Sequence, residues 1–291
     1  MSPESQGPAR TPYGDLLRGA IAFLAVLVVA RFEFEIVGLP HDMAQYVSAT
    51  VGMLFVAIYV AAVGPLRGGL QKFSQLFLPA FILSAWTQAW VMVATIIAAV
   101  LRLKRSHFAE PQDYGNWGHL GRHLLGHVIE IGIFFIIILL LMAAIRVLWR
   151  WPITVAPGAL LGVFVIMRLW TEVMGVEAWR AAAWSSTILV LLSALYIGGV
   201  GASRGLTTAR KLLAPSLALG LVWRYWVYLA TLDAALVPSY KTHFFDRSQG
   251  HIAARLIRLL GASVIEGLIA GLILWGIAVW ISRATRPRAA T

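Results

Sequence analysis

The sequence predicts an all-α polytopic membrane protein, with eight transmembrane helices that form two parallel four-helix repeats related by pseudo-twofold symmetry. Of the 291 residues, 59% are hydrophobic and 13% are charged, and the mean hydropathy is +0.78, outside the range of soluble globular proteins. Mostly apolar runs recur along the chain, each long enough to cross ~30 Å of hydrocarbon as a helix. None alternates as a barrel strand does, so helices are the expected spanning elements.

The eight predicted spans follow one another at short intervals. They cover residues 19–39, 45–64, 74–101, 124–148, 157–175, 181–200, 213–236 and 259–281. The fifth is the least apolar, because it contains Arg168 and Glu172, but its counterpart in the repeat is the first span. The predicted divisions are a polar N-terminal tail (1–18), a first repeat (19–150), a second repeat (157–282) and a basic C-terminal tail (283–291).

The repeat becomes visible when the sequence is aligned with itself at an offset of about 137 residues. Polar residues fall on one another, and these coincide by chance far less often than apolar residues do in a membrane protein. The aligned pairs include Arg31 with Arg168, Glu35 with Glu172, Gly38 with Gly175, Ser48 with Ser185, His107 with His243, and Glu130 with Glu266. Because each copy holds an even number of spans, both insert the same way up, and we expect a parallel duplication.

The basic residues favour one orientation in the membrane. With eight spans, both termini lie on the same side, and the loops on that side carry more Arg and Lys than the opposite loops. This predicts cytoplasmic termini in a plasma (inner) membrane. The net charge of +11 is explained by these loops beside anionic lipid, so the expected partner is the bilayer and not a nucleic acid. A homo-oligomer is compatible with the sequence.

Each predicted copy carries one arginine near the membrane midplane and two glutamates in the outer half. At a rise of about 1.5 Å per residue, the arginines lie roughly 3 Å from the midplane and the glutamates roughly 6–9 Å toward the outside. These residues are Arg31, Glu35 and Glu130 in the first copy and Arg168, Glu172 and Glu266 in the second. A charge that faces lipid there costs at least ~2.5–3.5 kcal/mol, so we expect these groups to face one another or water.

Two interpretations of these charges stay open. Arg31 and Glu35 are spaced i, i+4, as are Arg168 and Glu172, so each pair can form a structural ion pair on one helix face. Alternatively, the carboxylates line a cavity open to the outer side and handle a proton, a cation or a small polar solute. Arg224 supports a cavity, because it lies near the centre of the seventh span with no acid close by on its own helix.

Gln88 in the third span aligns with Arg224, and tryptophans flank both residues. We therefore include Gln88 and Arg224 with the six charged residues above in the predicted substrate or ion pathway. A central layer of this kind is typical of a path for a polar species.

Histidines form a second pattern. His119, His123 and His127 are spaced i, i+4, i+8 and form one stripe, with Glu130 on the same helix face. Imidazole and carboxylate at this spacing suit a divalent metal. The second copy has Arg255, Leu259 and Ser263 in these places, so such a site would belong to the first half alone. The alternative is that histidines simply suit the membrane boundary, and we predict no cofactor, while a divalent metal or haem stays open.

Both copies contain a His-Phe pair, His107-Phe108 and His243-Phe244. Because imidazole changes charge near neutral pH, we predict a gating or pH-sensing role for the two histidines, through contact with Glu130 and Glu266.

No motif assigns a reaction. The chain lacks cysteine, a phosphate-binding GxxxxGK[ST] loop, GxSxG and HExxH, and no family's defining motif is matched. The preferred function is a channel or transporter for an ion or small polar solute, which makes an enzyme the less favoured class. The first alternative is a membrane-embedded redox or metal-dependent enzyme with haem, quinone or divalent metal at the outer His/Glu layer. The second is a non-catalytic membrane subunit or lipid-binding scaffold.

Overall fold

The computed structural model describes residues 14–44, 46–67, 69–236, 242–245 and 251–285. These residues form helices joined by turns, with no strand among them, so the predicted all-α class is confirmed for this part of the chain. Seven helical segments within it are long and apolar enough to cross a membrane. They are Ala49–Arg67, Phe73–Val100, Trp117–Leu148, Pro152–Val173, Ala178–Val200, Ala209–Ala235 and Ile252–Ala284.

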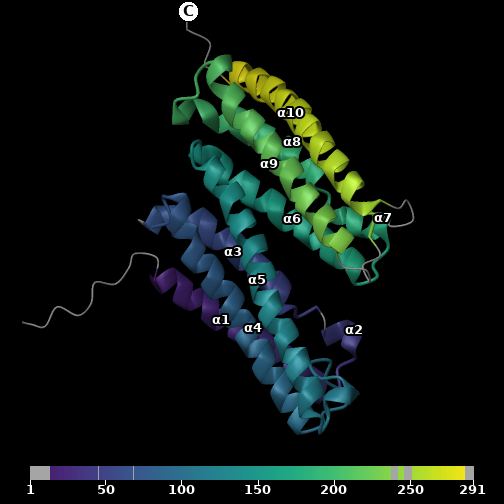
Figure 1. Cartoon of the computed structure of the whole chain (residues 1–291). Coiled ribbons are helices and arrows are strands. Elements are labelled where there is room, and N and C mark those ends of the chain that lie inside the picture. The colour runs from purple at the N-terminus through teal and green to yellow at the C-terminus, as the bar shows by residue number, and fades with distance from the viewer. Residues whose placement is uncertain (1–13, 45, 68, 237–241, 246–250, 286–291) are drawn as a thin grey trace, which may run out of the picture. The chain divides into compact units, whose positions relative to one another are not determined.

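The chain divides into two compact units, Met1–Ala143 and Ala144–Thr291. The first unit contains α1 (Gly14–Ile36), α2 (His41–Ala44), α3 (Ala49–Val63), η1 (Gly64–Arg67), η2 (Phe73–Leu76), α4 (Phe77–Val100), η3 (Pro111–Asp113) and most of α5 (Trp117–Leu148). Helices α1, α3 and α4 pack against one another, and α5 lies along α4 (Figure 1).

The second unit has the same order of long helices. It contains η4 (Pro152–Thr154), α6 (Val155–Val173), α7 (Ala178–Ala181), η5 (Ala182–Trp184), α8 (Ser186–Val200), η6 (Gly201–Arg204), α9 (Ala209–Leu236) and α10 (Ile252–Ala284). Helices α6, α8 and α9 contact one another, and α10 packs along α8 and α9 (Figure 1).

The ends of equivalent helices are built in the same way. The side chains of Ser48 and Ser185 accept a backbone hydrogen bond at the first turns of α3 and α8. Gly38 and Gly175 follow α1 and α6 with φ of +95° and +83°, the left-handed conformation that glycine adopts without steric cost. Each glycine N–H donates to the carbonyl of a glutamate, Glu35 or Glu172, at 3.1 and 2.9 Å, which closes the last helical turn.

The first predicted span corresponds to α1, which is not among the seven helices identified by length and composition. Its last two turns contain Arg31, Glu33 and Glu35, so its charge content is higher than that of the other helices. The helix also begins at Gly14, so residues 14–18 of the predicted N-terminal tail are helical. Residues 1–13 and 286–291 of the two predicted tails lie outside the described residues.

Helices α5 and α10 begin earlier than the spans predicted at 124 and 259. Residues 119–127 and 252–258 lie within the first turns of the long helices. No proline interrupts either stretch, and Asn116 starts α5 by accepting the His119 N–H at 3.0 Å. A helix of 32 residues is about 48 Å long, so α5 exceeds the ~30 Å hydrocarbon layer.

Glycines set the contact between α9 and α10. A Cβ on Gly220 would lie 2.8 Å from the Cα of Gly271 and would also collide with the carbonyl of Gly267. The equivalent place in the first unit is filled by Ser84, whose hydroxyl donates to the Ile131 carbonyl at 2.7 Å. The two helix pairs therefore approach closely at the same level by different chemistry.

We predict that Gly220→Ala weakens the second unit. Overpacking of this kind costs about 1–3 kcal/mol, so the unfolding temperature of the detergent-solubilised protein should fall. Gly276→Ala on α10 is the matched control, since a Cβ there meets nothing within 4 Å, and its unfolding temperature should be unchanged or higher. Equal behaviour of the two variants would contradict the close contact.

Candidate functional site

The carboxylate of Glu35 is the centre of a polar cluster at the end of α1. Its side chain is fully buried, and Arg31 Nε lies 3.5 Å from its Oε1. The backbone N–H of His107 donates to Oε2 at 2.9 Å, and the His107 Nδ1 lies 2.7 Å from the same oxygen. We call Arg31, Glu35 and His107 the Glu35 cluster.

The same arrangement occurs at the end of α6 in the second unit. Arg168 Nε donates to Glu172 Oε1 at 3.3 Å, and the His243 N–H donates to Oε2 at 2.9 Å. The His243 Nδ1 lies 2.6 Å from Oε2. The Glu172 cluster, formed by Arg168, Glu172 and His243, therefore repeats the Glu35 cluster contact by contact.

Each cluster attaches a loop to the end of a helix. A carboxylate in the last turn of a helix lies near the negative end of the helix dipole, and burial removes its water. Donors from the arginine one turn earlier and from the loop that follows α4 or α9 replace that water. The clusters hold the loop residues 106–108 and 242–244 in place, with Ser106 and Thr242 accepting the N–H of Phe108 and Phe244.

The partners of the two histidines differ from those the sequence suggested. His107 and His243 contact Glu35 and Glu172, whereas Glu130 lies against His127 and Glu266 lies against Arg224. The reason is that the loops after α4 and α9 fold back over the ends of α1 and α6, a path that spacing alone does not reveal.

Arg224 on α9 forms an ion pair with Glu266 on α10, through Nη2 and Oε2. The sequence required a partner from another helix, and Glu266 provides it. The guanidinium also lies 5.7 Å from the centre of the Trp223 ring. Glu266 leaves 52% of its side chain exposed.

The equivalent place in the first unit has no arginine. Gln88 on α4 is buried, with only 3% of the residue exposed, and its Oε1 has no hydrogen-bond partner among the described residues. The Oε2 of Glu130 on α5 lies 2.9 Å from the His127 Nδ1. The Glu130 side chain is 46% exposed. The Nε2 of His127 is buried and likewise has no partner in the described part of the chain.

Asp113 joins the other two histidines, and the sequence analysis missed this residue. Its Oδ1 lies 2.6 Å from the His119 Nδ1, and its Oδ2 lies 2.8 Å from the His123 Nδ1. The Glu110 N–H also donates to Oδ2, at 2.8 Å. An acid shortly before a helix that carries histidines at i and i+4 was the available signal.

These contacts shift the titration of Asp113, which lies in the loop before α5. Burial by itself would raise the pKa of this carboxyl, but the hydrogen bonds from His119, His123 and the Glu110 backbone outweigh it. The pKa of Asp113 is therefore lower than its ordinary value.

The predicted metal site at His119, His123 and His127 stays a prediction. Among the described residues, no three His, Asp or Glu side chains converge in a way that could hold a metal ion. Each of the three imidazoles directs its Nδ1 to a carboxylate, so a metal would have to use the Nε2 atoms.

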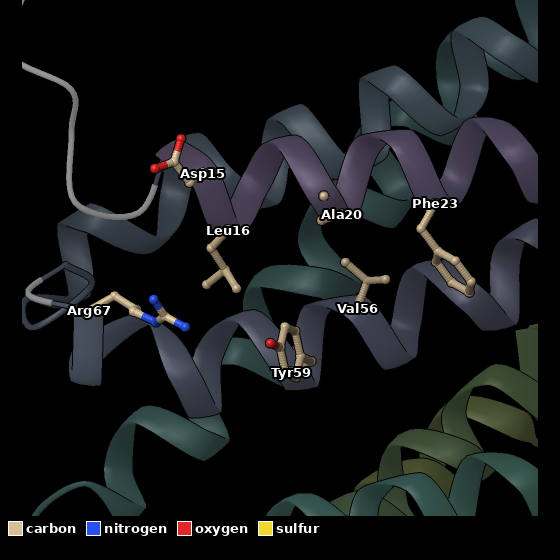
Figure 2. Close-up of a pocket in the computed structure, with 8 residues that line it drawn as sticks. Asp15, Leu16, Ala20, Phe23, Val56, Tyr59 and Arg67 are labelled. Carbon is tan, nitrogen blue, oxygen red and sulfur yellow. The ribbon is translucent and has the colours of Figure 1, made fainter.

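A cavity of about 450 Å³ lies between α1 and α3 (Figure 2). Its polar lining comes from Asp15, Tyr59 and Arg67, and its apolar lining includes Phe23 and Val56. None of the predicted pathway residues lines this cavity, so it is separate from the clusters described above.

Comparisons with family models, with curated proteins and with solved structures found no match. What the fold and the site define is a class: an all-helical chain with the apolar helices of an integral membrane protein and polar clusters between them.

We predict that Glu172→Gln loosens the end of α6. The amide loses the ion pair with Arg168 and the charge-assisted contact with His243, which should lower stability by about 2 kcal/mol. The unfolding temperature in detergent, followed by tryptophan fluorescence, measures this. Glu177→Gln is the control, because its carboxylate is exposed, and an equal fall in both variants would argue against a structural cluster.

A second prediction concerns pH. Because the folded-state pKa of Asp113 is depressed, its carboxylate stabilises the fold at pH values above the ordinary aspartate pKa of about 3.9. This stabilisation is lost as the pH falls through the folded-state pKa. Asp113→Asn should therefore lower the unfolding temperature at pH 7, and the gap to the unmodified protein should narrow below about pH 4. The exposed Asp15→Asn serves as the control, and a gap that widens in acid would contradict the assignment.

Proposed function

We propose that the protein is a membrane transport protein, a channel or transporter that passes an ion or small polar solute along Glu130 and Glu266. The observation that carries this proposal is the partial exposure of these two carboxylates, 46% and 52% of their side chains. Both lie on helices that are long and apolar enough to cross a membrane.

The physical argument is the cost of placing charge in lipid. Glu130 and Glu266 fall roughly 9 and 6 Å from the centre of their spans. A carboxylate facing hydrocarbon there costs at least ~2.5–3.5 kcal/mol, so exposed carboxylates at this depth favour contact with water. His127 lies against Glu130 and Arg224 lies against Glu266, so each carboxylate has a polar neighbour in its own unit.

The other charges of the predicted pathway have a structural role in this proposal. Glu35 and Glu172 are buried and contact an arginine, an imidazole and a backbone N–H each. A carboxylate with these partners is poorly placed to bind and release a solute. Arg31 and Arg168 belong to the same clusters, so the path is assigned to Glu130 and Gln88 in the first unit and to Glu266 and Arg224 in the second.

The same proposal includes eight spans in two four-helix repeats, both termini in the cytoplasm and a location in the plasma (inner) membrane. The support is the matching order of helices, the matching caps at Ser48 and Ser185, and the matching Glu35 and Glu172 clusters. Helix α1 counts as the eighth span because Arg31 and Glu35 offset each other's charge within the Glu35 cluster, which lowers the cost of burying them.

We predict that the double variant Glu130→Gln, Glu266→Gln loses transport. A factor of ten corresponds to ~1.4 kcal/mol, which is less than the ~2.5–3.5 kcal/mol associated with a charge at this depth. Removing both carboxylate charges should therefore lower flux by at least roughly tenfold. Proton, sodium and potassium fluxes into proteoliposomes are the measurements.

Glu177→Gln is the control for the reconstituted protein, because its carboxylate lies in an exposed loop. Unchanged flux in the double variant would remove these carboxylates from the mechanism. Absence of any flux in the unmodified protein, together with a visible absorption band or a bound metal, would instead favour the redox or metal-dependent alternative.

A further inference from the structure

Five side chains of the first unit form a continuous titratable row, the histidine row: Asp113, His119, His123, His127 and Glu130. Building on the proposed transport function, we propose that this row is a proton relay and that the species carried past Glu130 is the proton. The row belongs to the first unit alone.

The outer end of the row is open to solvent. His119 and His123 leave 29% and 24% of their side chains exposed, and the two oxygens of Asp113 hold them at 2.6 and 2.8 Å. Exposed imidazoles exchange protons with water near neutral pH. The buried Asp113 carboxylate lies between the two rings, within hydrogen-bond distance of both Nδ1 atoms, and so connects them.

The row continues down α5 by one helical turn at a time. The rings of His123 and His127 are 5.1 Å apart and 31° from parallel. Each ring directs its Nδ1 to a carboxylate, so in this relay a proton passes between the two rings through their Nε2 atoms. In each transfer an N–H bond of an imidazolium breaks as an N–H or O–H bond forms on the neighbour, and one positive charge moves with the proton.

The inner end delivers the proton to a carboxylate at membrane depth. The His127 Nδ1 is 2.9 Å from Glu130 Oε2, within the range of direct proton transfer. A proton moving from imidazolium to carboxylate leaves two neutral groups, which suits an apolar surrounding. Glu130 is about half exposed, so it can release the proton again.

Two buried polar atoms mark the same level. Ser84 Oγ on α4 donates to the Ile131 carbonyl on α5. Gln88 is one turn after Ser84 on α4, and His127 is one turn before Ile131 on α5, so Gln88 and His127 lie at the same level. Gln88 Oε1 and His127 Nε2 both lack a hydrogen-bond partner among the described residues. A protonated His127 Nε2 is a donor, and Gln88 Oε1, at the same level, is an acceptor that lacks a donor.

The described residues of the second unit contain no such row. Arg255, Leu259 and Ser263 occupy the places of the three histidines, and Arg224 contacts Glu266. There Glu266 lies against a guanidinium in place of an imidazole. The charged groups beside the row in the first unit include Arg122, one turn after His119 on α5, besides Asp113 and Glu130, and Glu110 donates its backbone N–H to Asp113.

Proton uptake into proteoliposomes, driven by a potassium diffusion potential and followed with an internal pH dye, tests this relay. The expected result is measurable uptake by the unmodified protein and a loss of roughly tenfold or more in His123→Ala, in line with the weight of a positioned proton-transfer group. External imidazole should restore uptake in His123→Ala, since the removed side chain lay at the solvent-exposed end of the row.

Leu259→Ala is the matched control, because Leu259 holds the place of His123 in the second copy, and its proton uptake should be unchanged. His127→Asn is a second variant that leaves the Asp113 contacts intact and should also lose uptake. Unfolding temperatures identify any variant that has lost its fold.

Each contrary result overturns the relay in a distinct way. Full uptake in His123→Ala and His127→Asn removes the histidines from the path. Loss that imidazole does not restore assigns His123 a structural role. One tightly bound zinc per chain that depends on His123 assigns the row to metal binding. Sodium or potassium flux that depends on Glu130, without proton uptake, overturns the relay but leaves the proposed transport function standing, whereas no flux of any kind removes both.

Discussion

A carboxylate buried at the end of an apolar helix must replace its lost hydration with other donors, and this requirement organises both units. Glu35 and Glu172 obtain those donors from an arginine on their own helix and from a histidine in a distant loop. Residues 106–108 and 242–244 are thereby fixed against the helix ends. In the first unit this contact also sets where the chain enters the segment that leads to α5.

The two units use this common frame for different polar contents. In the first unit, Ser84 donates a hydrogen bond to the Ile131 carbonyl. In the second unit, the equivalent residue is Gly220, which lies against the backbone of Gly267 and Gly271. Gln88 and Arg224 occupy equivalent places, one neutral and one permanently charged. The clusters at the helix ends have the same chemistry in both units, whereas the side chains between the long helices differ. A difference in function between the units would arise in that layer.

The sequence predicted what depends on local spacing. The helices follow from apolar runs, and the pairing of Arg31 with Glu35 follows from an i, i+4 relation on one helix face. The contact of His107 with Glu35 was not predictable in this way, because the loop after α4 that carries His107 could reach either Glu35 or Glu130. Asp113 was missed for a related reason: a lone acid in a loop gives no periodic signal, and its importance appears only when α5 is seen to begin at Trp117.

The length of α5 has a consequence for how protons would reach the chain. His119 stands eleven residues before Glu130, so on the proposed placement it lies roughly 25 Å from the bilayer centre. Lipid headgroups extend to about 20–22 Å, so this imidazole projects past them into the aqueous medium. Free hydronium is scarce near neutrality, and dissolved buffers such as phosphate or bicarbonate carry most of the exchangeable acid. A ring that stands clear of the lipid can collide with these molecules directly, so supply from outside is governed by the buffering capacity of the surrounding fluid.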